Sequence, residues 1–230
     1  MRGNQKNKDY KMKWTPEFAY AIGLLTTDGN LSIDGRHIEF TSKDIQHVRL
    51  FKKCMNLKGI KIGKKKNGYS DKKYYRIQFS NVRLYKKLLK IGLMPNKSKR
   101  IKRLKIPNKY FFDFLRGCFD GDGSFYFYWN LRWKSSFMFY TIFCSGSLAF
   151  IKWLRKKIKT LLNIKGHIDP NGSRQEWELK FAKKESKVII PRLYYQISLP
   201  YLQRKYKKVI EALKTEEIMR TWRNPEGAQA

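Results

Sequence analysis

Apolar and polar residues follow the same order of periodicities twice along the chain. A nearly apolar segment, Phe18 to Thr27, is followed by a short hairpin pattern, a helical pattern, a second hairpin pattern and another helical pattern. The same succession starts again at Phe112. Each half is therefore predicted to fold in the order α-ββ-α-ββ-α, and the chain is predicted to be α+β and pseudo-symmetric.

The expected boundaries follow from where these patterns change. The hairpins are predicted at 31–42, 59–80, 125–145 and 166–181. The second hairpin of each half, 59–80 and 166–181, carries an Asn-Gly turn signal. The helices that follow them are predicted at 44–57, 81–91, 147–163 and 185–196, with a C-terminal helix at 202–222. We expect a basic tail (1–13), a first half (14–92), a basic linker (93–108), a second half with the C-terminal helix (109–222) and a flexible tail (223–230).

The opening helix of each half ends on the same residue pair. At a constant offset of about a hundred residues, Gly23 matches Gly117, and Asp28 followed by glycine matches Asp122 followed by glycine. The glycines, Gly29 among them, are expected to end the helices in the left-handed conformation. The aspartates add negative charge to the negative end of a helix dipole, which favours a cation beside them.

Small residues on these two helices indicate how the halves meet. Ala19, Gly23 and Thr27 are spaced by four in the first helix, as are Gly117 and Gly121 in the second. Such stripes let two helix backbones approach closely. If the helices pack side by side in parallel, Asp28 and Asp122 converge into a divalent metal site suited to phosphodiester hydrolysis.

The charge of the chain selects a polyanionic partner. It has 51 Lys plus Arg against 18 Asp plus Glu, a formal net charge of +33. With 42% hydrophobic and 15% aromatic residues, the chain is expected to fold rather than stay disordered. It shows neither an apolar run of membrane-spanning length nor a secretory signal, so an intracellular protein is expected.

Strand alternation separates a core face from an outward face that is expected to contact nucleic acid. In the first half the candidate DNA-binding residues are His37, Glu39, Thr41, Lys61, Lys64, Tyr74, Arg76 and Gln78. In the second half they are Arg132, Lys134, Arg174, Glu176, Glu178 and Lys180.

The segments AIGLLTTDG (Ala21 to Gly29) and LRGCFDGDG (Leu115 to Gly123) resemble the two signature motifs of LAGLIDADG homing endonucleases. The resemblance covers the chain from about Trp14 to Trp222 and is to the single-chain, double-motif branch. It implies that the motif helices form the interface, with Gly23 and Gly117 in it, and that a four-stranded antiparallel sheet in each half lies along the DNA major groove. It also implies a monomer that cleaves both strands of a long DNA site with Mg²⁺ and leaves 3′ overhangs; Mn²⁺ or Ca²⁺ can occupy the same sites.

The resemblance assigns roles to further residues. It makes Asp28 and Asp122 the metal ligands, with the carbonyls of Thr27 and Gly121 as additional ligands. Peripheral basic and polar groups are expected at the ends of strands, where this chain carries Ser42, Lys43, Ser145, Gly146, Asn81 and Lys183. We expect Lys43 and Lys183 to be the catalytic lysines. The chain departs from a common pattern at Ser42, where many relatives have Gln, and at Gly146, which has no side chain.

Three other functions stay open on the sequence alone. An intron maturase would bind RNA to assist splicing, a regulator would bind DNA without cleaving it, and a basic ribosomal or nucleoid protein would leave the repeated Asp-Gly ends unexplained. Intron encoding is expected over intein encoding, and intron RNA is a second candidate partner beside double-stranded DNA.

Overall fold

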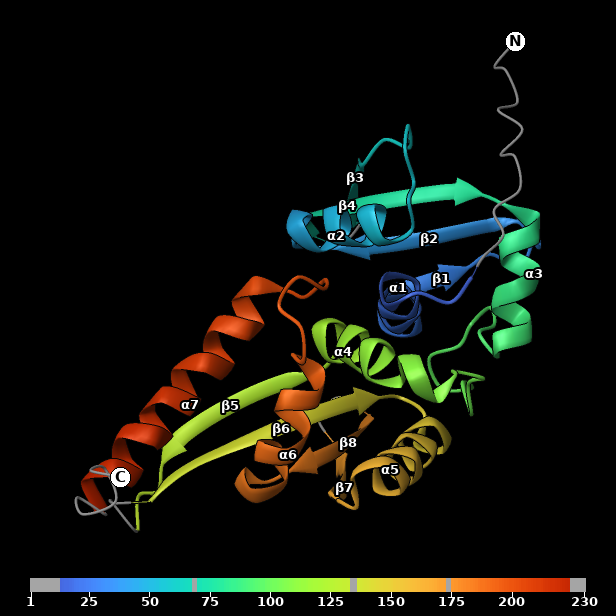
Figure 1. Ribbon diagram of the computed structural model, residues 1–230. Helices are drawn as coiled ribbons and strands as arrows, with labels where there is room; N and C mark the ends of the chain where they lie inside the picture. Colours follow the sequence, from blue (N-terminus) through green and yellow to red (C-terminus); the bar gives the residue numbers. More distant parts are fainter. Residues whose placement is uncertain (1–12, 68–69, 133–135, 173–174, 224–230) are drawn as a thin grey trace.

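The computed structural model describes residues 13–67, 70–132, 136–172 and 175–223. In these residues the chain forms two four-stranded antiparallel sheets with helices packed on them. Helices α1 and α4 lie side by side between the two sheets (Figure 1). This arrangement confirms the predicted α+β fold with two related halves.

The first half follows the predicted order of elements. Its helices are α1 (Pro16–Thr27), α2 (Ile45–Cys54) and α3 (Val82–Ile91). Its strands are β1 (Gly29–Leu31), β2 (His37–Ser42), β3 (Gly63–Asn67) and β4 (Ser70–Ser80), in the sheet order β1-β2-β4-β3.

The second half repeats this order and adds a C-terminal helix. A short 3₁₀ turn, η1 (Asn108–Tyr110), leads into α4 (Phe111–Gly121), and the later helices are α5 (Leu148–Leu162), α6 (Lys183–Leu193) and α7 (Gln203–Arg223). The strands are β5 (Ser124–Trp129), β6 (Phe137–Ser145), β7 (His167–Asn171) and β8 (Glu176–Phe181), in the sheet order β5-β6-β8-β7. The two sheets therefore have equivalent topologies.

Helix boundaries follow local capping signals. The Thr15 hydroxyl accepts a hydrogen bond from the Phe18 amide at 3.1 Å, and Pro16 opens α1. Asn81 caps α3 by accepting from the Leu84 amide at 2.9 Å. These caps satisfy amide groups that the first helical turn leaves without partners.

The α1/α4 interface depends on the absence of side chains at two glycines. A Cβ atom added at Gly23 would lie 2.2 Å from the Phe114 carbonyl oxygen, and one added at Gly117 would lie 2.1 Å from the Tyr20 carbonyl oxygen. Both distances are far below van der Waals contact, so the two backbones touch at this point. Nearly all of α1 is buried as a result.

The glycines after the two helices have a different role from the predicted one. The left-handed glycines in the described chain do not include Gly29 or Gly123, and Asp28 and Asp122 themselves have right-handed helical angles. An added Cβ would lie 2.6 Å from the Leu25 Cα at Gly29 and 2.6 Å from the Phe119 carbonyl oxygen at Gly123. Glycine is required here because the chain folds back closely over the preceding turn.

The segment between the halves, predicted as a basic linker, is packed against the protein. Leu93, Ile101, Leu104 and Ile106 are all buried in it. Among the residues that the structure describes, helices long and apolar enough to cross a membrane are absent.

Replacing Gly117 with alanine is expected to destabilise the protein by roughly 2 kcal/mol, because the new methyl group would overlap the Tyr20 backbone. The matched control is Gly63→Ala, where the nearest atom to an added Cβ is 3.8 Å away. Urea unfolding of both variants measures the difference. Equal stability of Gly117→Ala and the wild-type protein would contradict the close helix contact.

Candidate active site and nucleic-acid interface

The C-terminal ends of α1 and α4 meet beside the two aspartates. An added Cβ at Gly121 would lie 2.0 Å from the Thr27 hydroxyl oxygen, so the residues directly before Asp28 and Asp122 are in contact. Each aspartate is the C-cap residue of its helix. Asp28 is half-buried, whereas Asp122 is exposed and opens the site to solvent.

The environment of both carboxyl groups disfavours their ionised form. Removal of water around Asp28, followed by the neighbouring Asp122 carboxylate, raises the pKa of Asp28 from 3.8 to about 7. The surrounding protein also raises the pKa of Asp122, although this residue is exposed on one side. Two carboxylates at the negative ends of two helices therefore form a local excess of negative charge.

Two lysines offset this charge, one from the segment between the halves and one from the C-terminal helix. The Lys97 ammonium donates to the carbonyls of Thr27 at 2.8 Å and Gly29 at 2.7 Å, and thus brackets Asp28. The Lys205 ammonium on α7 donates to the Gly121 carbonyl at 3.1 Å and to the Gly123 carbonyl, and thus brackets Asp122.

Both lysine ammonium groups lower the pKa of both aspartates. Loss of water around the ammonium group lowers the pKa of Lys205 to about 8, and it also lowers the pKa of Lys97. The two lysines and two carboxylates thus form one electrostatic cluster.

The predicted catalytic lysines lie elsewhere. Lys183 donates to the Phe137 carbonyl at 2.8 Å and forms an ion pair with Glu216 on α7. Lys43 is exposed, with its ammonium 5.5 Å from the centre of the Tyr74 ring. The structure brings Lys97 and Lys205 to the aspartates instead, and no local sequence signal distinguishes these two among the 51 basic residues.

A buried network holds Lys205 in place. Arg116 is fully buried and donates to the Leu193 carbonyl at 2.8 Å and the Pro200 carbonyl at 2.7 Å. The Asp120 carboxylate accepts from the Leu202 amide and the Tyr20 hydroxyl, both at 2.7 Å. The motif helix α4 thereby fixes the segment that leads into α7, which carries Lys205.

The outward face of the first sheet is polar. Glu39, Thr41, Arg76 and Gln78 lie on it in two cross-strand pairs, Glu39 with Gln78 and Thr41 with Arg76. Glu39 also forms ion pairs with Arg76 at 3.7 Å and with Lys65 of β3 at 3.5 Å.

The other first-half candidates lie around this face. His37 contacts Asp34 at the start of β2, and Tyr74 pairs with Lys65 on the outward side. Lys61 is exposed in the loop before β3. Lys64 pairs with Tyr75, so it points to the opposite side of the sheet from Lys65.

The outward face of the second sheet combines charged and aromatic residues. Lys180 forms ion pairs with Glu178 at 2.9 Å and Asp169 at 3.4 Å, and Glu176 pairs with Asn171 across the strands. Arg132 is exposed after β5, whereas Lys134 and Arg174 lie outside the described residues. The predictions missed three tyrosines on this face: Tyr126, Tyr128 and Tyr140. The signal for Tyr126 and Tyr128 was the segment SFYFYW, which is aromatic on both strand faces. Tyr140 lies on β6, where it pairs with Tyr126.

The comparisons with known proteins find similar structures but no match to a family model or a curated protein. Among solved structures, the I-WcaI homing endonuclease bound to its DNA recognition sequence has a TM-score of 0.61 at 15% identity, covering 90% of this chain and 95% of that one. The LAGLIDADG homing endonuclease I-LtrWI bound to target DNA has a TM-score of 0.58 at 17% identity, covering 90% and 91%. The chain has the LAGLIDADG fold.

The same fold occurs in a protein with a different name. Full-length DUF199/WhiA from Thermatoga maritima has a TM-score of 0.52 at 18% identity over 86% of this chain. The chain spans 62% of the length of that protein. The LAGLIDADG fold therefore does not by itself specify one activity.

The donor atoms at the paired helix ends fit a hard divalent cation. Carboxylate oxygens are the ligands that Mg²⁺ prefers, and Mg²⁺ usually keeps several waters while one or two carboxylates hold it. In the described part of the chain, clusters of three or more His, Cys, Asp or Glu with metal-binding geometry are absent. Asp28 and Asp122 would thus hold the ion, with water and substrate phosphate completing its coordination. The Thr27 and Gly121 carbonyls already accept from lysines, which leaves each one lone pair.

The peripheral positions that the LAGLIDADG resemblance singled out have local structural roles. Ser42 accepts from the Asp44 amide at 3.2 Å, and Ser145 accepts from the Ser147 amide at 3.1 Å, so both shape the turn before the next helix. An added Cβ at Gly146 would lie 2.9 Å from the Ser98 carbonyl oxygen, which explains the missing side chain.

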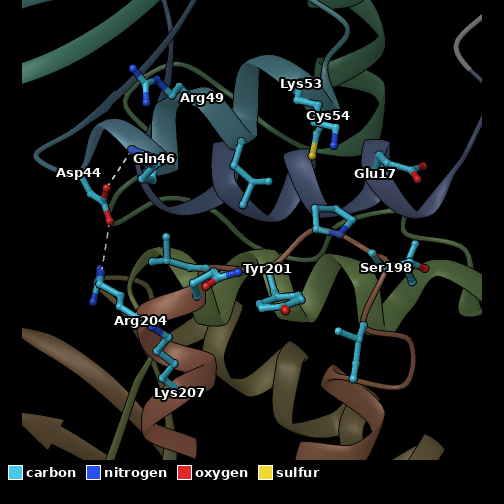
Figure 2. A pocket seen from close by; sticks show the side chains of 16 residues that line it. Glu17, Asp44, Gln46, Arg49, Lys53, Cys54, Ser198, Tyr201, Arg204 and Lys207 are labelled. Carbon is cyan, nitrogen blue, oxygen red and sulfur yellow. Dashed lines mark hydrogen bonds and ion pairs between the residues drawn. The ribbon is translucent and has the colours of Figure 1, made fainter.

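A cavity of about 880 Å³ lies between α2 and the segment that leads into α7. Figure 2 shows Asp44 and Arg204 facing each other across it, with their ion pair at 3.5 Å. Neither Asp28 nor Asp122 lines this cavity. It is a separate gap between the two halves of the LAGLIDADG fold.

Asp28→Asn is expected to stabilise the metal-free protein at high pH. The folded-state pKa of Asp28, about 7, lies above the ordinary value of 3.8. Between these two pH values the unfolded chain loses the proton while the folded protein keeps it, so the wild-type protein loses stability as pH rises from 3.8 to about 7. Asparagine does not ionise. At about pH 8.5 the variant should therefore unfold several degrees above the wild-type protein, and at about pH 4 the two should converge.

The control is the exposed Asp34, where hydrogen bonds from His37 hold the carboxyl pKa well below its usual value. Asp34→Asn should give no gain in unfolding temperature at high pH, because ionised Asp34 is the favoured form. Thermal unfolding of both variants in chelator measures the contrast. A lower unfolding temperature for Asp28→Asn at high pH would contradict the repulsion between the carboxylates.

Proposed function

We propose that the protein is a site-specific endonuclease that hydrolyses both strands of a long double-stranded DNA target with a divalent metal ion and leaves 3′ overhangs. Because one chain supplies both motif aspartates, the proposed active form is a monomer. The observation that carries the proposal is the convergence of Asp28 and Asp122, each bracketed by a lysine, at one solvent-open point of a chain with a net charge of +33.

The comparisons support the choice of substrate. I-WcaI and I-LtrWI, which share the fold over 90% of this chain, are homing endonucleases seen bound to DNA. The homing endonuclease I-DmoI, at a TM-score of 0.51, was crystallised with DNA and Mn. WhiA shares the fold without the endonuclease name, so the carboxylate pair rather than the fold carries the proposed cleavage.

In the proposed function, the sheet faces bind DNA and the residues at the helix ends carry out the hydrolysis. The outward sheet faces and surface lysines bind the duplex and hold a phosphate of each strand near the helix ends. A bound divalent ion would activate water and stabilise the leaving oxygen. Asp28 and Asp122 would hold that ion, and the Lys97 and Lys205 ammonium groups would stabilise negative charge that develops on the phosphate.

Replacing Asp28 or Asp122 with asparagine should abolish cleavage while leaving DNA binding within a few-fold, because the carboxylates bind metal rather than bases. The assay incubates the protein and Mg²⁺ with a randomised duplex library and sequences the cut ends. The wild-type protein should enrich one long site with a 3′ stagger, and neither variant should. Full cleavage by either variant, or tight binding to structured RNA with no cleaved duplex, would refute the proposal, and the latter would favour a maturase.

The lysines provide a second test of the same site. Lys97→Met and Lys205→Met should each slow cleavage of the selected site by roughly 100-fold or more. Each variant removes an ammonium group that would stabilise the negative charge of the reacting phosphate. Lys43→Met and Lys183→Met are the matched controls, since they remove ammonium groups that contact Tyr74 and Glu216. These controls should cleave within a few-fold of the wild-type rate.

Single-turnover cleavage with saturating protein separates the chemical step from binding. Unfolding temperatures of the four lysine variants show whether a loss of rate reflects a loss of fold. If Lys43→Met or Lys183→Met lost cleavage while Lys97→Met and Lys205→Met kept it, the strand-end lysines would be the catalytic ones and the assignment made from the structure would be wrong.

A further inference from the structure

Three tyrosines form an aromatic cluster on the outward face of the second sheet, where two are exposed and Tyr140 is half-buried. Tyr126 and Tyr128 lie on β5 and Tyr140 lies on β6, directly opposite Tyr126. The ring centres are 5.1 to 6.3 Å apart and the ring planes are within 20° of parallel. Tyr126 is 37% exposed and Tyr128 is 41% exposed. We name these three residues the tyrosine patch.

The patch is separate from the core of its sheet. The opposite face of the same strands carries Phe125, Phe137 and Phe139, which are buried. Met138, which pairs with Tyr128, extends the apolar surface on the outward side. Large aromatic side chains on an exposed face commonly mark a contact surface.

The equivalent surface of the first sheet has different chemistry. On β2, the outward positions are His37, Glu39 and Thr41, and on β1 the outward position is Asn30. Polar side chains of this kind can form hydrogen bonds with base edges. The tyrosine patch instead presents stacked ring faces, with a single hydroxyl on each ring. The two halves therefore differ in the kind of contact that they offer to a duplex, although their strands have the same topology.

We propose that the tyrosine patch contacts thymine methyl groups in the major groove, so that the half-site bound by the second sheet is selected for thymine. The methyl group is the apolar feature by which a major groove distinguishes thymine from the other bases. The inference rests on the proposed function, because it assumes that the outward sheet faces bind duplex DNA. The patch is continuous with the proposed cleavage site, since β5 starts two residues after Asp122.

The spacing along β5 fixes where these thymines lie. Tyr126 and Tyr128 are four and six residues beyond Asp122. At a strand rise of about 3.3 Å per residue, they lie about 13 and 20 Å from the carboxylate pair. With about 3.4 Å between successive nucleotides, these lengths correspond to roughly four and six base pairs from the centre of cleavage.

The polar neighbours of the patch leave this surface available to a methyl group. Lys180 lies near Tyr126 and Tyr140, but its ammonium forms ion pairs with Glu178 and Asp169. The Lys180 ammonium is therefore engaged by these two carboxylates, and the tyrosines present the apolar contact.

The test uses the duplex recovered from the cleavage selection, and binding is measured with the Asp28→Asn protein to prevent cutting. Thymines four to six base pairs from the centre on the second half-site are replaced by deoxyuridine, which removes only the methyl groups. Each buried methyl is expected to contribute about four-fold in affinity. Uracil at the same distance in the first half-site is the matched control and should have little effect.

A double-mutant cycle assigns the effect to the patch. In a protein with Tyr126→Gln and Tyr128→Gln, thymine and uracil duplexes should bind equally, and a fresh selection should lose thymine enrichment at these positions. Circular dichroism and thermal unfolding confirm that the double variant is folded. Loss of the thymine preference only in this variant would support the proposal.

The outcomes separate this inference from the proposed function. A protein that cleaves its selected site, but binds uracil and thymine duplexes equally, retains the proposed function and overturns the thymine contact. A protein that binds no duplex, and instead binds single-stranded RNA in a way that Tyr126→Gln weakens, overturns both. The same uracil penalty in the wild-type and double-variant proteins would place the methyl contact elsewhere and overturn the inference.

Discussion

The contact between α1 and α4 is the constraint on which the rest of the molecule depends. Gly23 and Gly117 let the two backbones touch, and at the far end Gly121 lies against Thr27. This approach places two carboxyl groups at the negative ends of two adjacent helices, an arrangement that opposes stability without a nearby cation. The glycines therefore determine both how the halves join and where the charged site forms.

Two lysines that are distant in sequence from each other offset the repulsion between the two carboxylates. Lys97 comes from the segment between the halves and Lys205 from the C-terminal helix, yet both donate to the carbonyls that flank the aspartates. The buried Arg116 and Asp120 on α4 anchor the chain before Lys205. The motif helix thus positions the lysine as well as its own aspartate. Substitutions of Arg116 or Asp120 should therefore displace Lys205, although neither residue lies at the carboxylate pair.

The two halves share a topology but not a surface. Both sheets have the same strand order, while the outward face is polar in the first half and carries the tyrosine patch in the second. In a symmetric dimer both faces would be identical, because one sequence would form both. A single chain that contains both halves can carry different residues on its two sheets, and the proposed asymmetric DNA target would use this difference.

The sequence alone determined the repeat, the order of elements and the pairing of Asp28 with Asp122, because these follow from local periodicity and from two motifs in constant register. It also identified Gly23 and Gly117 as small residues on facing stripes. It misjudged Gly29 and Gly123, whose role depends on packing over the preceding turn rather than on a left-handed angle. Only the tertiary structure distinguished Lys97 and Lys205 from the other basic residues, since a lysine acquires this role from the carbonyls that surround it and those come from another part of the chain.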